Sequence, residues 1–290
     1  MRFSYAESMC DPAFYLPLAR AAEEAGYDGF VVPDSICYPE VSDSKYPYTP
    51  DGDRRFLEDK PFVEPFSVIP AMAAVTEKLL FSTFVVKLPI RNPVLVAKQA
   101  SSVAVMSQDR FLFGVGSSPW PDDYRILDQP WKRRGKRMDE MLEIIRGLTA
   151  GGYYEFHGEF YDIESIKISP VSERPIPILI GGHSEAALKR AARIGGGWMH
   201  AGGDPSELGV MIDRLSELRA EYGRSELPFE VHVISMEAYS PDGVKRLEDL
   251  GVTDAIVGFR NAYEMGPDRE PLEDKLAALS RFADGVIAKL

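Results

Sequence analysis

The chain has 290 residues, of which 45% are hydrophobic and 27% are charged, a balance typical of a soluble globular protein with a large core. Its formal net charge of −12 argues against nucleic acid or an anionic membrane surface as the main partner. No apolar run approaches the roughly 18 residues of a membrane span, and no signal-peptide pattern follows Met1. Because there are only 2 cysteines, we expect no disulfide framework and a cytoplasmic location.

The first third of the chain has a strand–helix–strand pattern. Residues 2–9 predict a strand, Asp11-Pro12 begins a helix that ends at Gly26, and residues 29–33 predict a second strand. The irregular segment 36–61 follows, and loops of this length are usually either functional or disordered. Its tyrosines favour an ordered lid over disorder; they are Tyr38, Tyr46 and Tyr48.

The central stretch repeats this pattern. A helix is predicted over 62–76, an apolar strand over 79–86, a helix over 94–106, and a strand over 111–113 that stops at the small residues 114–118. Parallel strands need such helical crossovers. Residues 121–152 predict a short helix and then a long one, and residues 153–161 predict a small hairpin.

Four more strands are predicted in the second half, at 175–180, 197–200, 230–235 and 253–258. Helical segments follow them, beginning near Glu185, Asp204, Ser240 and Pro271. Eight strands, each followed by helical sequence and with no linker between domains, predict one α/β domain over residues 1–290. We expect a (β/α)8 TIM barrel with loop insertions. A doubly wound sheet is the alternative, but Gly-x-Gly-x-x-Gly does not follow the first strand.

In such a barrel the functional groups lie at the C-terminal ends of the strands. These predicted ends are rich in glycine, serine and aromatic residues, and no metal site is expected because the histidines lack ligand-like spacing. A mouth of this composition suits a flat ring-shaped cofactor that carries out the chemistry itself. Glu7, Asp34 and His200 are the candidate proton donors, although each also has a structural interpretation as a loop cap or a core histidine.

Two further patterns are open to two interpretations. The turn 181–184 precedes a helix, where free N–H groups favour a phosphate, but an ordinary strand-to-helix turn has the same sequence. The basic run 132–137 is either a contact for an anionic cofactor tail or a solvated helix face, and we favour the solvated face.

The sequence resembles the luciferase-like monooxygenase superfamily, in particular its branch that uses the deazaflavin coenzyme F420. The resemblance covers nearly the whole chain. It rests on the order and spacing of several weak motifs: EEAGYDGF at 23–30, LPIRNP at 88–93 with AK at 97–98, GVG at 114–116, RGKRMDE at 134–140 and PILIGG at 177–182.

The resemblance implies a bacterial-luciferase-type barrel in which the cofactor ring stacks near the third strand, often over a non-prolyl cis peptide at about Phe84-Val85. It implies an F420-dependent oxidoreductase that transfers a hydride to or from a small organic substrate, and a homodimer. An FMN-dependent monooxygenase is the first alternative, and a non-catalytic flavin-binding protein is the second. The implied cofactor-binding residues are Asp34, Phe84, Val85, Gly116, Ser117, Ser118, Gly181, Gly182 and His183.

The chain departs from the family pattern at two places. Many relatives carry Asp-His after the second strand, where this chain has Asp34-Ser35, so a histidine proton donor is in doubt there. Relatives also commonly have Ala-Asp-Gly-Trp where this chain has three glycines before Trp198, which removes a carboxylate.

Overall fold

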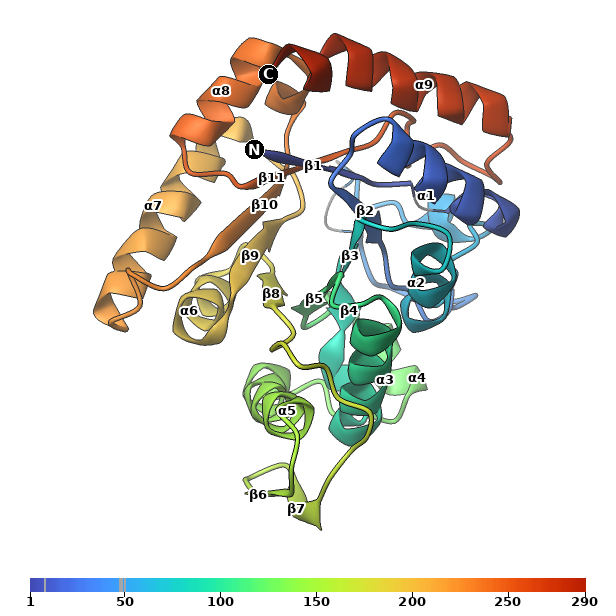
Figure 1. The fold of residues 1–290 in the computed structure, drawn as a ribbon. Helices are drawn as coiled ribbons and strands as arrows, with labels where there is room; N and C mark the ends of the chain where they lie inside the picture. Colours follow the sequence, from blue (N-terminus) through green and yellow to red (C-terminus); the bar gives the residue numbers. More distant parts are fainter. Residues whose placement is uncertain (8, 47–48, 50) are drawn as a thin grey trace.

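The computed structural model describes residues 1–7, 9–46, 49 and 51–290. Parallel strands close into a barrel in the order β3-β2-β1-β11-β10-β9-β8-β5-β4, and β3 also pairs with β5 (Figure 1). Because β3 and β4 are two pieces of one barrel strand, the predicted eight-stranded TIM barrel is confirmed. The bounds are β1 Arg2–Tyr5, β2 Gly29–Val32, β3 Leu80–Thr83, β4 Val86–Lys87, β5 Phe111–Gly116, β8 Ile178–Gly181, β9 Gly197–His200, β10 Glu230–Ile234 and β11 Asp254–Val257.

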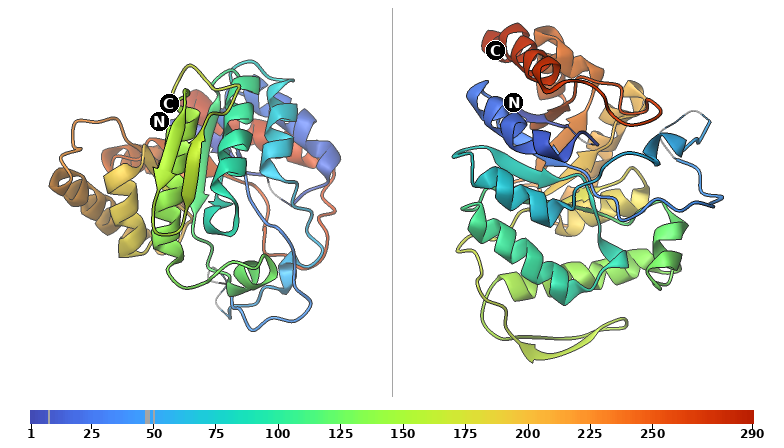
Figure 2. Two further views of the ribbon diagram at one scale, coloured as in Figure 1. Left: turned by 90° about the horizontal axis from the view of Figure 1, so that it is seen from below. Right: turned by 90° about the vertical axis from the view of Figure 1, so that its right-hand side faces the viewer.

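The helices surround the barrel, as Figure 1 and Figure 2 show. Several begin where the sequence predicts, because Asn92, Asp204 and Ser240 each accept a backbone N–H of the first turn and are followed by proline. No helix within the described residues is long and apolar enough to cross a membrane. The bounds are α1 Tyr15–Glu24, α2 Pro65–Ala73, α3 Pro93–Met106, α4 Pro121–Ile126, α5 Arg134–Thr149, α6 Glu185–Ile194, α7 Pro205–Glu221, α8 Pro241–Asp249 and α9 Leu272–Gly285.

Several predicted elements differ from the structure in extent, three of them most clearly. The first strand ends at Tyr5, and Ser8, which the prediction included, lies outside the described residues. The strand predicted over 79–86 is interrupted by a cis peptide bond between Phe84 and Val85, the position that the family resemblance implies. The hairpin is present, but its strands are β6 Tyr154–His157 and β7 Asp162–Ile166, and it extends away from the barrel (Figure 1).

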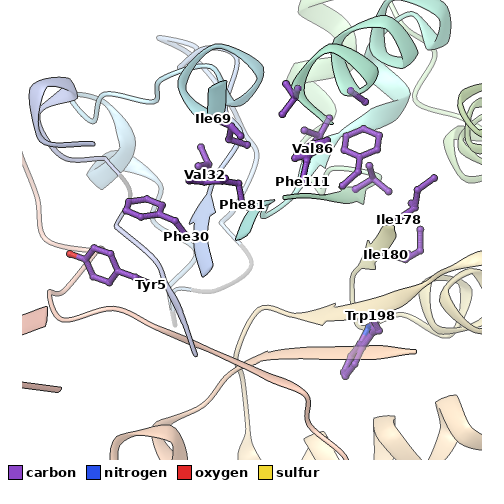
Figure 3. Close-up of a cluster of buried hydrophobic side chains, with 14 of the residues drawn as sticks. Tyr5, Phe30, Val32, Ile69, Phe81, Val86, Phe111, Ile178, Ile180 and Trp198 are labelled. Carbon is purple, nitrogen blue, oxygen red and sulfur yellow. The ribbon is translucent and has the colours of Figure 1, made fainter. Parts of the chain in front are cut away.

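Alternate residues of the barrel strands face opposite sides, and this alternation separates two apolar clusters. The inner cluster fills the barrel and contains Val31, Leu112, Leu179, Met199 and Ile256. The outer cluster lies between the strands and the helices; its members in Figure 3 include Phe30, Val32, Phe81, Ile180 and Trp198.

Candidate active site

Val85 lies at the barrel mouth, which is the C-terminal end of the strands, beside the ends of β5 and β8. Phe84 and Val85 pack on the inner cluster. A Cβ atom on Gly116 would lie 2.7 Å from Val85 Cγ2, and one on Gly181 would lie 2.9 Å from Val85 Cγ1. Both distances are too short for carbon atoms, so glycine is required at the ends of β5 and β8 to let Val85 lie across the mouth.

A buried ion pair holds the strand segment beyond Val85. Asp34 Oδ1 accepts a hydrogen bond from Arg91 Nη2 at 2.8 Å, and Asp34 Oδ2 accepts one from the backbone N–H of Lys87 at 2.8 Å. The Arg91 Nη1 group donates to the backbone carbonyl of Lys87 at 2.9 Å. Asp34 and Arg91 therefore hold the N–H and the carbonyl of Lys87. The role that the structure shows for Asp34 is to position this backbone.

The Lys87 ammonium lies beside β5. Its strand pairs with β5 so that Lys87 is opposite Gly116, and its Nζ is 2.8 Å from Asp123 Oδ2 at the start of α4. Ser118 Oγ donates to the same Asp123 oxygen at 2.8 Å and accepts the Trp120 N–H at 3.1 Å. Sequence reasoning included Lys87 only in a predicted strand end and Arg91 only in a family motif, and it named neither of them, nor Asp123, as a site residue. The only sequence signal was a lysine directly after an apolar strand.

Aromatic side chains from two loops pack together beside Trp120. Segment 36–61 packs Tyr46 and Phe56 against each other, with ring centroids 5.0 Å apart. Tyr46 also contacts Trp120 at 5.9 Å and Tyr263, from the loop after β11, at 5.9 Å. These contacts fix Tyr46 and Phe56 in place, the lid itself stays a prediction, and Tyr48 lies outside the described residues. Ser117 anchors α4 because its backbone carbonyl accepts the Tyr124 hydroxyl.

The turn between β8 and α6 combines a glycine of positive φ with a capped helix N-terminus. Gly182 has φ +123°, a conformation that disfavours any side chain. Ser184 caps α6 by accepting the Ala187 N–H at 3.3 Å. The remaining N–H groups of the first turn have no acceptor within the helix, and helix N-termini of this kind attract phosphate.

His183 and His200 form a stacked pair beside that turn, with ring centroids 4.3 Å apart and planes at 13°. His183 Nε2 accepts the Ala201 N–H at 3.2 Å, and His200 Nδ1 accepts the Gly202 N–H at 3.3 Å. Burial, and then the neighbouring His183 ring, lower the pKa of His200 to about 4, against an opposing contribution from the Ile234 carbonyl. Burial also lowers the pKa of His183, so both rings are neutral at pH 7.

Glu7 belongs to a different buried network. Its Oε1 accepts from Arg260 Nε at 2.8 Å and lies 3.3 Å from Lys275 Nζ, and its Oε2 accepts the Tyr5 hydroxyl at 3.0 Å. Lys275, on α9, also pairs with Asp268 at 2.8 Å. Glu7 therefore ties the end of β1 to α9.

The structure does not bring the three candidate proton donors together. Alternation along the strands places Glu7 on the same side as Tyr5, Asp34 on the side of Val32 and His200 on the side of Trp198, all toward the helices. Of the implied cofactor-binding residues, Phe84, Val85, Gly116 and Gly181 do converge at the mouth. In the basic run 132–137, Arg137 has a structural role, because its guanidinium donates to the carbonyls of Pro89 and Pro130.

A model of the family described as luciferase-like monooxygenase matches residues 4–282. An uncharacterized protein of Mycobacterium tuberculosis is 60% identical over 290 residues, covering 100% of both chains. The F420-dependent glucose-6-phosphate dehydrogenase of Tsukamurella paurometabola is 30% identical over 249 residues, covering 82% of this chain and 68% of its own. The coenzyme F420 dependent tetrahydromethanopterin reductase of Methanopyrus kandleri has the same fold, with a TM-score of 0.75, 16% identity and 99% of each chain covered.

Proposed function

The chain belongs to the luciferase-like monooxygenase family, and on this basis we propose that it is an F420-dependent oxidoreductase that transfers a hydride between the deazaflavin and a small organic substrate. The family and the relatives support an oxidoreductase or a monooxygenase in general. The choice of F420 is supported by relatives that are named for this coenzyme.

The observation that carries the proposal is the apolar platform at the barrel mouth. Phe84 and Val85 present apolar side chains above the inner cluster, and glycines 116 and 181 leave the room that the Val85 side chain itself occupies. Such a surface binds a ring face by contact area without supplying reactive groups of its own. Asp34 supports the platform indirectly, because it holds the backbone two residues beyond Val85.

The β8–α6 turn is the proposed phosphate site. Gly181, Gly182 and His183 would face a phosphate with backbone N–H groups at the N-terminus of α6, where the helix dipole favours negative charge. His183 and His200 are neutral, so the charge of this turn does not vary near pH 7. Ser117 and Ser118 would flank the ring from the end of β5.

When bound, the deazaflavin supplies the hydride chemistry, because carbon replaces the reactive central nitrogen of a flavin. The chain would orient the ring on Val85, cover it with the aromatic loops around Tyr46 and hold a proton near the substrate. Small-molecule binding under these loops is the proposed role of segment 36–61. We also propose that the protein is a homodimer, on the basis of the family alone.

The test is a titration of the purified protein with oxidised F420 and, separately, with FMN, followed by fluorescence quenching. We expect F420 to bind at least tenfold more tightly than FMN. Gly182→Ala is the matched variant, since a methyl group in its place would meet Ala187 Cβ at 3.1 Å and distort the phosphate turn. It should weaken F420 binding while the far-UV circular dichroism stays unchanged.

Preference for FMN would instead support the FMN-dependent monooxygenase. Binding of F420 without hydride transfer to any of a broad set of substrates would support the non-catalytic flavin-binding protein. Binding of neither cofactor would refute the proposal.

A further inference from the structure

Lys87 is an incompletely paired cation at the barrel mouth. A lysine ammonium has three N–H donors. Asp123 Oδ2, at 2.8 Å, is the one partner that Lys87 Nζ has among the described residues, although the side chain is only 13% exposed. Two donors therefore remain without an acceptor among the described residues, on a side chain that is mostly but not fully buried.

Lys275 provides an internal comparison for this pairing. Its side chain is 1% exposed, and its Nζ lies within 3.3 Å of three carboxylates, those of Glu7, Asp268 and Glu270. One acceptor for each donor is what a structural buried lysine requires. Lys87 has one carboxylate for three donors, so its spare donors are available to a ligand.

The backbone of Lys87 is held by two side chains in addition to the ion pair of its ammonium. Asp34 accepts its backbone N–H and Arg91 donates to its carbonyl, and these two side chains pair with each other at 2.8 Å. Lys87 also lies two residues after Val85, so the alternation along the strand places both side chains on the same side of the barrel wall. The ammonium is thus preorganised beside the ring platform.

We propose that Lys87 donates a hydrogen bond and then a proton to the oxygen of a carbonyl substrate. This inference rests on the proposed F420-dependent function and names its substrate class and proton donor. It also accounts for the absence of histidine at Ser35, since Lys87 supplies the donor from the neighbouring strand.

The step balances without any further reagent. When bound, the reduced deazaflavin would supply a hydride to the substrate carbon, and the C=O π pair would move to oxygen. That oxygen takes a proton from Lys87 Nζ, which is left as a neutral amine and regains a proton from solvent. In the reverse direction the neutral amine accepts the proton of an alcohol. An enone follows the same scheme, with the hydride added at the β-carbon and the proton ending on the enol oxygen.

Asp123 is a positioning residue in this scheme. Its carboxylate orients the ammonium, and Ser118 Oγ holds the same carboxylate oxygen at 2.8 Å. A positioned charged donor in a dry site stabilises a developing oxyanion far better than water does.

The experiment compares the wild type with Lys87→Gln, Lys87→Arg and the exposed α8 variant Lys245→Gln as matched control. Affinity for oxidised F420 is measured first. Each protein is then loaded with chemically reduced F420 and mixed with cyclohexanone or cyclohexenone in a stopped-flow instrument, and oxidation of the coenzyme is recorded. The two probes distinguish addition to the carbonyl carbon from addition to the β-carbon.

We expect Lys87→Gln to bind F420 within threefold of the wild type but to react at least 100-fold more slowly. Lys87→Arg keeps the charge and should recover part of the rate, and Lys245→Gln should match the wild type. A second readout is independent of turnover. In protein labelled with ¹⁵N-lysine, the NMR signal of the Lys87 side-chain nitrogen, assigned by its loss in Lys87→Arg, should shift when oxidised F420 and cyclohexanone are added together.

The possible failures are distinct. A wild type that does not bind F420 refutes the proposed function and this inference with it. A wild type that binds F420 but oxidises the reduced coenzyme with neither probe overturns the carbonyl assignment alone. A Lys87→Gln rate within threefold of the wild type, or a Lys87 signal that does not move, overturns the role of Lys87 while the proposed function stands.

Discussion

The ion pair between Asp34 and Arg91 makes a strong prediction because Asp34 is buried and Arg91 is largely so, with side-chain exposures of 1% and 13%. Asp34→Ala leaves the Arg91 guanidinium without its counter-charge and the Lys87 N–H without an acceptor. Breaking a buried pair from one side typically costs about 3–5 kcal/mol of unfolding free energy. Asp34→Asn keeps an oxygen for the Lys87 N–H, so we expect a smaller loss of about 1.5–3 kcal/mol.

A double-mutant cycle separates the pair from the backbone contact. In an Arg91→Met background, Asp34→Ala removes the carboxylate that has lost its partner and leaves no charge uncompensated, so it should cost at least about 1 kcal/mol less than it does in the wild type. The assay is urea unfolding of the purified protein at pH 7, followed by tryptophan fluorescence, with the midpoint and slope fitted for all four proteins. F420 affinity of the same set reports whether the segment from Val85 to Lys87 has moved.

Additivity of the two substitutions within about 0.5 kcal/mol would refute the reasoning, since it would mean that Asp34 and Arg91 do not stabilise each other. Unchanged F420 affinity in a clearly destabilised Asp34→Ala would contradict the view that this pair holds the ring platform.

Three further predictions follow from the same structure. Gly181→Ala should weaken F420 binding at least tenfold, because its methyl group would lie 2.9 Å from Val85 Cγ1, and adding Val85→Ala should restore part of the affinity in a fluorescence titration. The pKa of His200 in the folded protein, about 4, lies below its ordinary value of about 6.5. As the pH falls through this window the unfolded chain binds a proton first, so the free energy of unfolding should fall by up to about 3 kcal/mol. Urea unfolding at pH 7 and at pH 4.5 should show that His200→Gln lacks this loss. Tyr46→Ala removes the ring that contacts Trp120 and Tyr263, and limited proteolysis should then cleave segment 36–61 at least several-fold faster, while an unchanged rate would contradict the ordered lid.

The fold was predictable because each barrel strand and its helix carry local signals. Strand cores such as 111–113 are short apolar runs, and helix starts such as Asp204 combine a cap with proline. The position of the cis peptide before Val85 came from the family resemblance and not from any local signal. The network around Glu7 was not predictable, because Arg260 and Lys275 approach from the far end of the chain.

The candidate site was predictable in its glycines and not in its charged groups, and strand alternation explains the difference. Choosing residues at strand ends selects the correct layer of the barrel but not the correct face. Val31 and Met199 point into the barrel, so Asp34 and His200, at odd spacing from them, point outward. Lys87 follows Val85 by two residues and therefore shares its side of the strand. The two-residue spacing between Val85 and Lys87 is visible in the sequence. It predicts the side on which Lys87 lies only when Val85 is known to face inward.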